Sequence, residues 1–257
     1  SLQLLWIEMS MSHYTTAVVT GAASGIGEAV VKSLVHSGLS VFAVDKNREG
    51  LQQLSSSFDC QTLHLNLLNT KEIYSELSNI HCDVLINNAG LAHDLSSGFL
   101  EISAEKVDEM IGINLGAAIH VIRAILPGMR ERKRGHIIEM GSIAALYPLG
   151  LPIYSATKSA IHTLSQTLRM ELIGTKIRHT EICAGRTSTN FFETAFPNEN
   201  LRKEFVSQID MLAPEDIASI MHFVINAPLN VNVSLVEVTP VDQAPGGQIL
   251  KSTTDPS

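Results

Sequence analysis

A serine, a tyrosine and a lysine lie close together in residues 141–158, GSIAALYPLGLPIYSATK, and their types suit proton transfer. Tyr154 and Lys158 are four residues apart, so on a helix they share one face. A free phenol has a pKa of about 10, and a nearby ammonium lowers that value. Ser142 can meet the tyrosine across a strand-to-helix loop and hold a substrate oxygen. The alternative is an ordinary amphipathic helix, which the Tyr-x-x-x-Lys spacing alone would favour.

A second stretch, TGAASGIG at residues 20–27, has the composition of a nucleotide-binding turn. Gly21, Gly25 and Gly27 follow a short apolar run and precede a helical pattern. Glycine lets the backbone approach a pyrophosphate closely, and a helix N-terminus offers N–H groups to it. The spacing is G-x3-G-x-G rather than the standard G-x-G-x-x-G. The prediction of a nucleotide-binding turn therefore depends on the position of these glycines directly after the first expected strand.

Asp45 ends the second apolar run and predicts the choice of cofactor. A carboxylate at this place accepts hydrogen bonds from the hydroxyls of the adenosine ribose. It also repels a 2′-phosphate, which favours NAD over NADP. Lys46 and Arg48 follow directly and oppose that preference, so NADP stays open. The alternative is a plain turn residue.

Two groups of asparagines are further candidates. Asn87 and Asn88 begin NNAG after the fourth apolar run, where amides can tie the strand end together and line a nucleotide cleft. A generic turn is the alternative. Asn114 lies between Gly112 and Gly116 within a long helical pattern. The flanking glycines predict a local distortion of that helix, and a solvent-facing residue is the alternative.

The elements that must position these residues alternate between strand and helix patterns. Strands are predicted around residues 17–19, 39–45, 60–67, 82–87, 135–142, 175–185 and 232–241, with helices between them, including 103–135, 154–172 and 213–228. Such alternation predicts a single-domain α/β fold of the Rossmann type. Its parallel sheet of about seven strands would be doubly wound, with helices on both faces.

Three segments are predicted to lie outside this regular pattern. Residues 1–12 and 242–257 are expected to be tails around a domain at 13–241. The first tail has no basic segment typical of a secretory signal. Residues 187–207 are irregular and mixed in character, and they are placed where a lid over a substrate could be inserted.

The composition sets limits on function. Of the 257 residues, 45% are hydrophobic and the net charge is −8, which argues against a general binder of nucleic acid. No apolar run reaches the length of about 20 residues that a membrane helix needs. The three cysteines lack a C-x-x-C spacing and the ten histidines lack paired metal-ligand spacing, so no metal site is expected. A reducing, cytoplasmic compartment fits this cysteine usage.

Taken together, these motifs resemble the classical short-chain dehydrogenase/reductase family. The resemblance rests on TGAASGIG, NNAG, Asn114 in INLG, and Ser142 with YSATK, and it spans about residues 15–241. The stretch LPGMRERKRGHIIEMGSIAALYP and the ending VEVTPVDQAPGG are similar to the branch of 3-hydroxy acid (serine-type) dehydrogenases.

The resemblance implies a role for each matching residue. Tyr154 would be the general acid/base, with Lys158 binding the nicotinamide ribose, Ser142 orienting the substrate oxygen and Asn114 holding a water in a proton relay. The implied cofactor-binding residues are Gly21, Ser24, Gly25, Ile26, Gly27, Asp45, Asn66, Leu67, Asn88, Ala89, Gly90, Tyr154, Lys158, Gly185, Thr187 and Thr189. A homotetramer acting on a small molecule is also implied.

The sequence departs from the family pattern near the cofactor. Ala184-Gly185 stands where the family usually has Pro-Gly, which is expected to loosen that turn. Asn66 replaces an aspartate common near the adenine. The 3-hydroxy acid branch generally uses NADP, whereas Asp45 occupies the place of its basic residues.

Two classes of function are compatible with this fold. The first is an oxidoreductase that interconverts a secondary alcohol and a ketone, on a small 3-hydroxy acid or on polyols, amino alcohols or other carbonyl compounds. The second is a non-enzymatic nucleotide-binding regulator, which would have no need of Ser142, Tyr154, Lys158 and Asn114 together. Arg186 is a candidate partner for a substrate carboxylate, and a solvated arginine is the alternative.

Overall fold

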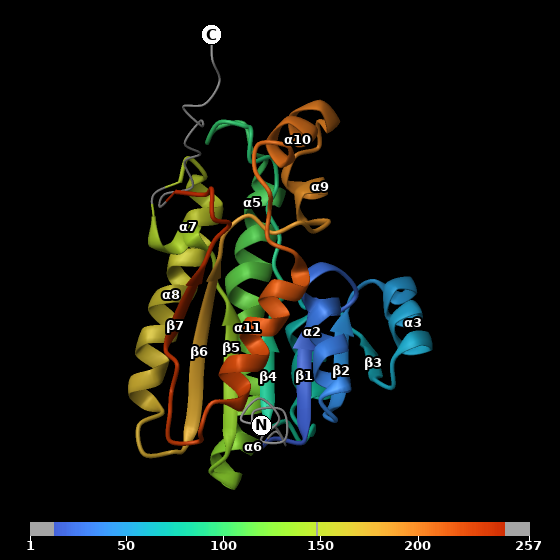
Figure 1. Ribbon diagram of the computed structural model, residues 1–257, viewed down its shortest axis with the longest axis vertical. Helices are drawn as coiled ribbons and strands as arrows, with labels where there is room; N and C mark the ends of the chain where they lie inside the picture. The colour runs from blue at the N-terminus through green and yellow to red at the C-terminus, as the bar shows by residue number, and fades with distance from the viewer. Residues whose placement is uncertain (1–12, 148, 245–257) are drawn as a thin grey trace, which may run out of the picture.

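The computed structural model describes residues 13–147 and 149–244, and these contain a seven-stranded parallel sheet. The strand order is β3-β2-β1-β4-β5-β6-β7 (Figure 1). The bounds are β1 (Thr16–Thr20), β2 (Ser40–Asp45), β3 (Gln61–His64), β4 (Val84–Asn87), β5 (Gly135–Met140), β6 (Ile177–Ala184) and β7 (Leu235–Val238). The predicted Rossmann-type α/β fold is confirmed. The order reverses between β1 and β4, where folds of this kind bind ligands at the carboxyl ends of the strands.

Helices cover both faces of the sheet, as predicted. One face carries α2 (Gly25–His36), α3 (Arg48–Ser57) and α11 (Pro214–Asn226), whose apolar residues share one buried cluster with the strands. The other face carries α4 (Thr70–Leu77), α6 (Ala118–Arg132) and α8 (Pro152–Glu171), which share a second cluster. The central strands β1 and β4 are mostly apolar, because a parallel sheet is buried on both faces, whereas β5 and β6 also contain buried polar residues.

The long helical pattern at 103–135 is interrupted where the glycines predicted a distortion. α5 (Ala104–Ile111) passes into a π-helical turn, η1 (Gly112–Ala117), and then into α6. By length and hydropathy alone, Ala104–Arg132 could cross a membrane. Half of its most apolar 18-residue window is buried inside the protein, and α4 packs against α6. Core helices of soluble proteins can have the same length and hydropathy.

Three parts of the structure differ from the sequence prediction. A short helix, α7 (Ile143–Leu146), fills the loop between Ser142 and Tyr154. The irregular segment contains α9 (Phe191–Ala195) and α10 (Glu199–Val206), which lie above the carboxyl end of the sheet (Figure 1). Gln243, which was assigned to a polar tail, is 5% exposed and bound to the turn after β6. Residues 1–12 and 245–257, the remainder of the predicted tails, lie outside the described residues.

Candidate active site

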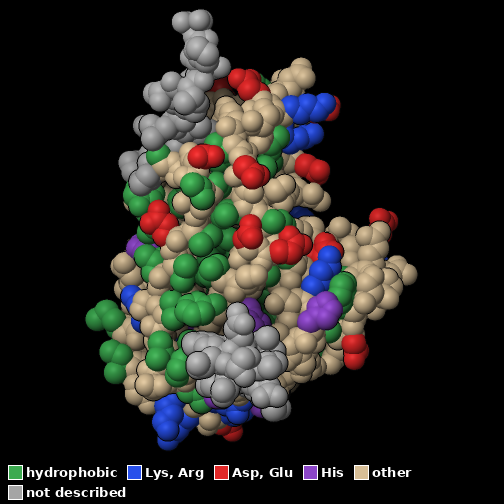
Figure 2. Space-filling view, viewed as in Figure 1, with side chains coloured by type: hydrophobic (Ala, Val, Ile, Leu, Met, Phe, Trp, Pro, Cys, Tyr) green, Lys and Arg blue, Asp and Glu red, His purple; other side chains and the backbone are tan. Residues whose placement is uncertain are grey.

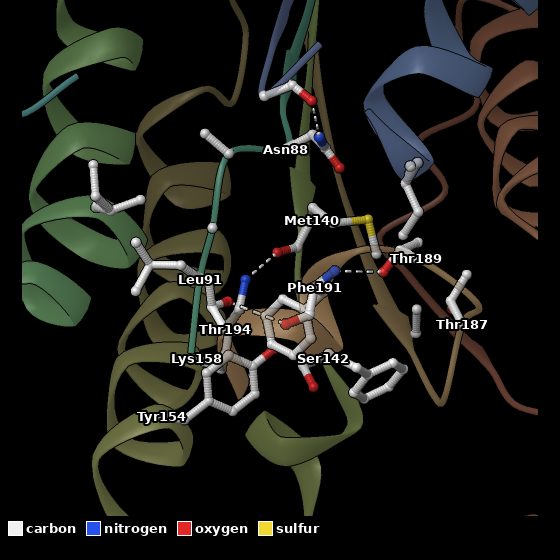
Figure 3. Close-up of a pocket in the computed structure, with 18 of the residues that line it drawn as sticks. Asn88, Leu91, Met140, Ser142, Tyr154, Lys158, Thr187, Thr189, Phe191 and Thr194 are labelled. Atoms are coloured by element: carbon white, nitrogen blue, oxygen red, sulfur yellow. Dashed lines mark hydrogen bonds between the residues drawn. The ribbon is translucent and has the colours of Figure 1, made fainter. Parts of the chain in front are cut away.

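A cavity of about 800 Å³ opens at the carboxyl ends of the strands, across the point where the strand order reverses (Figure 3). All but two of the predicted site residues line it: Gly21, Ser24, Gly25, Ile26, Asp45, Asn66, Leu67, Asn88, Ala89, Gly90, Ser142, Tyr154, Lys158, Gly185, Arg186, Thr187 and Thr189. Gly27 and Asn114 lie behind its wall. The fold therefore brings residues from across the sequence into one cavity.

The glycine turn forms one end of this cavity and has room for backbone only. Gly21 and Gly25 have positive φ angles of 64° and 54°, which L side chains rarely adopt. A Cβ atom on Gly21 would lie 2.9 Å from Ala89 Cα, and one on Gly27 would overlap the carbonyl oxygen of Gly21. Ser24 precedes α2, but its side chain makes no capping hydrogen bond. The first N–H groups of α2 and the Ser24 hydroxyl are therefore available to an anionic group such as a pyrophosphate.

Asparagine amides tie the ends of β1 and β4 together, as predicted for NNAG. Asn88 Nδ2 donates to the carbonyl oxygens of Thr20 and Gly21, each at 3.1 Å. In return, Thr20 Oγ1 accepts from the backbone N–H groups of Asn88 and Ala89. The neighbouring Asn87 points to the opposite side, where its Nδ2 donates to Glu139 Oε1 at 3.1 Å. These bonds fix the floor of the cavity where the strand order reverses.

Asp45 lies at the end of β2 and faces the cavity, with both carboxylate oxygens engaged by the backbone. Oδ2 accepts from Ala23 N at 3.0 Å, and Oδ1 accepts from Asn47 N at 2.8 Å. The two nearby cations have other partners: Lys46 Nζ is 3.7 Å from Glu109 Oε1, and Arg48 Nη2 is 3.3 Å from His64 Nδ1. The carboxylate is thus the fixed charge at this end of the cavity, next to the glycine turn.

Ser142, Tyr154 and Lys158 converge on the opposite part of the cavity (Figure 3). Ser142 lies two residues after β5 and caps α7, where its Oγ accepts from Ala144 N at 3.1 Å. Tyr154 and Lys158 lie one turn apart on α8, and the ammonium is 5.9 Å from the centre of the phenol ring. Lys158 Nζ donates to the carbonyl oxygen of Met140 at 2.8 Å. The side chains predicted to act together are therefore adjacent.

The electrostatics of Tyr154 differ from the simple expectation of a lowered pKa. Burial raises the pKa of the phenol to about 12, and a hydrogen bond with Ser142 offsets only part of that rise. Burial also lowers the pKa of Lys158, while Glu139, Cys183 and Glu181 act to raise it. At neutral pH the phenol is therefore protonated and can act as an acid.

Asn114 is buried behind the cavity and joins three elements. Its Oδ1 accepts from Leu91 N at 2.8 Å, and its Nδ2 donates to Leu91 O at 2.8 Å and to Thr157 Oγ1 at 3.1 Å. The side chain thereby links η1, the loop after β4 and α8. Single π turns inside α-helices are frequent at functional sites. The role of Asn114 in holding a water of a proton relay stays a prediction.

The turn after β6 is tightly held, although a loosened turn was expected. Gly185 N donates to Val238 O at 2.7 Å, and Arg186 N donates to Gln243 Oε1 at 2.8 Å. Thr189 Oγ1 accepts from Phe191 N at 3.3 Å at the start of α9. Hydrogen bonds from outside the turn therefore replace the rigidity that a proline would give.

Aromatic residues that the sequence prediction did not single out form the wall above Tyr154. Phe191 lies 5.7 Å from Tyr154 between ring centres, and Phe192 and Phe205 also line the cavity. Arg186 stacks on Phe205, with the guanidinium carbon 3.7 Å from the ring centre. Its Nη1 donates to Phe205 O at 3.1 Å and to Gln208 Oε1 at 2.9 Å. The phenylalanine-rich composition of residues 191–205 was the available signal for this wall.

Comparison with known proteins gives consistent results. A family profile described as short chain dehydrogenase matches residues 15–200. An uncharacterized short-chain type dehydrogenase/reductase of Sinorhizobium fredii is 37% identical over 238 residues, which is 92% of this chain and 96% of that protein. The NADP-dependent 3-hydroxy acid dehydrogenase YdfG of Salmonella typhi is 35% identical over 240 residues, 90% of this chain and 96% of that protein.

Solved structures show the same likeness. The closed form of serine dehydrogenase complexed with NADP+ superposes with a TM-score of 0.87 at 31% identity, covering 93% of this chain and all of that one. Serine dehydrogenase from Escherichia coli gives a TM-score of 0.78 at 31% identity, covering 90% of this chain and all of that one.

Proposed function

The chain belongs to the short-chain dehydrogenases, and from this we propose that it interconverts a secondary alcohol and a ketone by hydride transfer with a nicotinamide dinucleotide. The observation that carries the proposal is the convergence of Ser142, Tyr154 and Lys158 on the cavity that also contains the glycine turn. A non-enzymatic regulator would need the glycine turn but not these three side chains.

The cavity fits such a dinucleotide. The glycine turn and the first N–H groups of α2 would hold the pyrophosphate, because the Ser24 side chain does not cap these N–H groups and they line the cavity. Asp45 would hold the adenosine ribose, and Lys158 the nicotinamide ribose. When bound, the nicotinamide ring would accept or donate the hydride.

The protein contributes position and proton transfer. Ser142 Oγ would hold the substrate oxygen, and Tyr154 Oη would donate a proton to it during ketone reduction or accept one during alcohol oxidation. Lys158 would hold the nicotinamide ribose and bring its positive charge to bear on the phenol. That charge opposes the effect of burial, which raises the phenol pKa to about 12.

For the cofactor we propose NAD, with NADP as the alternative. The support is Asp45, whose carboxylate is held between Ala23 N and Asn47 N beside the glycine turn. The relative from Salmonella typhi is NADP-dependent and the closed serine dehydrogenase is complexed with NADP+, which favours the alternative. Lys46 lines the same end of the cavity and would be the partner of a 2′-phosphate.

For the substrate we propose a 3-hydroxy acid. Arg186 lines the cavity together with Ser142 and Tyr154. Within residues 13–147 and 149–244, only Nη1 of its guanidinium has hydrogen-bond partners, so Nε and Nη2 can take a carboxylate in bidentate fashion. Phe191, Phe192 and other apolar residues form much of the remaining wall, which suits a hydroxy acid better than a polyol.

The test is a screen of 3-hydroxy acids, polyols and amino alcohols with NAD and with NADP, followed by variants. In Arg186→Met, KM for the 3-hydroxy acid should rise by about 10- to 100-fold, as for a lost hydrogen bond to a charged group. KM for an uncharged secondary alcohol should change little. Arg202→Met, which removes another arginine of the same segment, is the control. An equal effect of Arg186→Met on both substrates would reject the carboxylate assignment.

Two properties of the whole protein remain proposals. A homotetramer is supported by the family and by exposed apolar side chains on α11 and β7. A cytoplasmic location is supported by Cys60, Cys82 and Cys183, which are free thiols. Sedimentation and cell fractionation would test them.

A further inference from the structure

Three polar side chains from different elements are linked along one wall of the cavity. Lys46 follows β2, His93 lies in the loop after β4 and Glu109 is on α5, and all three line the cavity. Glu109 Oε1 is 3.7 Å from Lys46 Nζ, and Glu109 Oε2 is 2.8 Å from His93 Nε2. The proposed function uses Lys46 only as the partner of a 2′-phosphate, and it gives Glu109 and His93 no role.

Glu109 is the better fixed of the two charged groups. Its side chain is 32% exposed, whereas that of Lys46 is 63% exposed. Because an ionised carboxylate only accepts hydrogen bonds, His93 Nε2 is the donor in their contact, and the His93 side chain is itself only 15% exposed. One carboxylate oxygen of Glu109 is therefore held by His93, and the other is presented to Lys46.

The contacts of Glu109 keep its carboxyl group charged at neutral pH. The hydrogen bond from His93 and the positive charge of Lys46 lower the pKa of this group below its ordinary value, and burial opposes them only in part. The Lys46 ammonium therefore has a negative partner, and the two charges largely cancel when seen from a distance.

Lys46 is the cation at the Asp45 end of the cavity. Among the residues that the structure describes, three lysine or arginine side chains line the cavity: Lys46, Lys158 and Arg186. Lys158 and Arg186 belong to the part that contains Tyr154 and the aromatic wall above it. A phosphate on the 2′-hydroxyl of a ribose held by Asp45 would therefore depend on Lys46 for a positive partner.

We propose that Glu109 is a specificity-determining residue for the cofactor, which disfavours NADP by holding the Lys46 ammonium in an ion pair across the cavity wall. The proposal rests on the proposed function, in which this end of the cavity binds the adenosine of a nicotinamide dinucleotide. Asp45 acts on the ribose hydroxyls directly, and Glu109 acts on a 2′-phosphate through Lys46.

The competing explanation is a direct repulsion between the Glu109 carboxylate and the phosphate. The two explanations differ in whether the effect of removing Glu109 requires Lys46. If Glu109 acts by holding the ammonium, its removal releases nothing in a chain without Lys46. If it repels the phosphate directly, its removal helps with or without Lys46. A double-mutant cycle between the two residues therefore separates the explanations.

The first measurement is the binding of two adenosine fragments, which involves no hydride transfer. Adenosine 2′,5′-bisphosphate contains the 2′-phosphate, and 5′-AMP lacks it. In Glu109→Gln, titration calorimetry should show the ratio of the two Kd values shifted about 3- to 10-fold toward the bisphosphate, as for a partly screened ion pair. The glutamine keeps an oxygen that can accept from His93. Asp108→Asn removes the neighbouring exposed carboxylate of α5, which does not line the cavity, and should leave the ratio unchanged.

The second measurement completes the cycle. In the Lys46→Met background, Glu109→Gln should change the same ratio by less than about twofold. The gain seen in Glu109→Gln alone should shrink as the salt concentration rises, because an exposed ion pair is screened. In the complete enzyme, the ratio of kcat/KM for NADP to that for NAD should rise in Glu109→Gln and stay near the wild-type value in Asp108→Asn.

The outcomes separate this role from the proposed function. A fragment ratio that shifts as expected in a protein without hydride transfer would reject the proposed function and retain the role of Glu109. An active wild type with an unchanged ratio in Glu109→Gln would retain the function and overturn the role. A gain of equal size with and without Lys46 would also overturn it, because Glu109 would then act on the phosphate directly.

Discussion

At the scale of single residues, two effects act on the pKa of the Tyr154 phenol in opposite directions. Burial favours the protonated form, and the hydrogen bond with Ser142 favours the phenolate. Lys158 is one turn away but is bound to Met140 O. The ammonium therefore lies beside the phenol ring, where its positive charge favours the phenolate.

Replacing Tyr154 with phenylalanine removes the proton carrier while keeping the ring that packs on Phe191. The value of kcat should fall by at least about 100-fold, as is typical of general acid–base groups. Cofactor affinity, measured by calorimetry, should change little. Tyr147→Phe is the control, since Tyr147 binds Glu237 and does not line the cavity. Comparable turnover in Tyr154→Phe and the wild type would contradict the mechanism.

Asp45 is the residue that decides between the two cofactors. Its carboxylate is fixed by two backbone N–H groups, whereas Lys46 and Arg48 are exposed and paired elsewhere. Surface charges are weakened by screening more than a close contact is. The wild type should therefore prefer NAD.

Asp45→Ser should shift the ratio of kcat/KM for NADP to that for NAD by at least about 10-fold toward NADP, because a close like-charge repulsion is removed. Asp59→Ser, which removes an exposed carboxylate after α3, should leave the ratio unchanged. A wild type that already prefers NADP would show that this interpretation of the end of β2 is wrong.

Glu139 makes stability depend on pH. Its pKa is raised to about 8 in the folded protein from an ordinary value of 4.5, so folding favours the protonated form. The stability that this provides is complete below about pH 4.5 and is lost as pH rises through about 8. Glu139→Gln should remove this dependence, and its Oε1 can still accept from Asn87. Thermal unfolding between pH 5 and 9 should show a flatter profile in the variant than in the wild type.

At the scale of elements, the site depends on where helices begin, end and change their winding. The break in the 103–135 helix could be predicted, because glycine has local conformational preferences that act within a few residues. The convergence of the predicted motifs followed from the alternating pattern, since parallel strands present their carboxyl ends at one edge.

Other features could not be predicted because they depend on distant contacts. The Phe191–Phe205 wall requires α9 and α10 to fold over the sheet edge, and Gln243 requires the chain to return to Gly185. The bond between Lys158 and Met140 O depends on how α8 sits on β5. Propensity and spacing contain no information about such packing, so the rise in the Tyr154 pKa was missed as well.

A substitution at Asn114 would measure how much one side chain stabilises the packing of η1, the loop after β4 and α8. Asn114→Ala leaves the N–H and carbonyl of Leu91 without their partner, which should cost about 2 kcal/mol in the free energy of unfolding. Urea unfolding would measure this cost. Asn200→Ala on the exposed face of α10 is the control and should change the free energy by less than about 0.5 kcal/mol. An Asn114→Ala variant as stable as the wild type would show that the π turn does not need this link.

At the scale of the whole molecule, the doubly wound sheet leaves apolar side chains exposed on one flank. Figure 2 shows hydrophobic side chains gathered over α11 and β7. Phe223 is 63% exposed, Leu229 54% and Leu235 42%. Contiguous apolar surface of this kind marks an interaction site, and most soluble homo-oligomers close it by two-fold symmetry.

We expect this flank to be buried between copies of the chain in a homotetramer, or at least in a dimer. Phe223→Glu places a charge in the centre of the contact, where its desolvation opposes association. Sedimentation at micromolar concentration should show the wild type as an assembly and the variant as a species of half or a quarter of that mass. Leu100→Glu adds the same charge at a side chain that is 91% exposed and lies far from α11 in sequence, so it should sediment as the wild type does. A wild type that sediments only as a monomer would contradict this assignment of the α11–β7 flank.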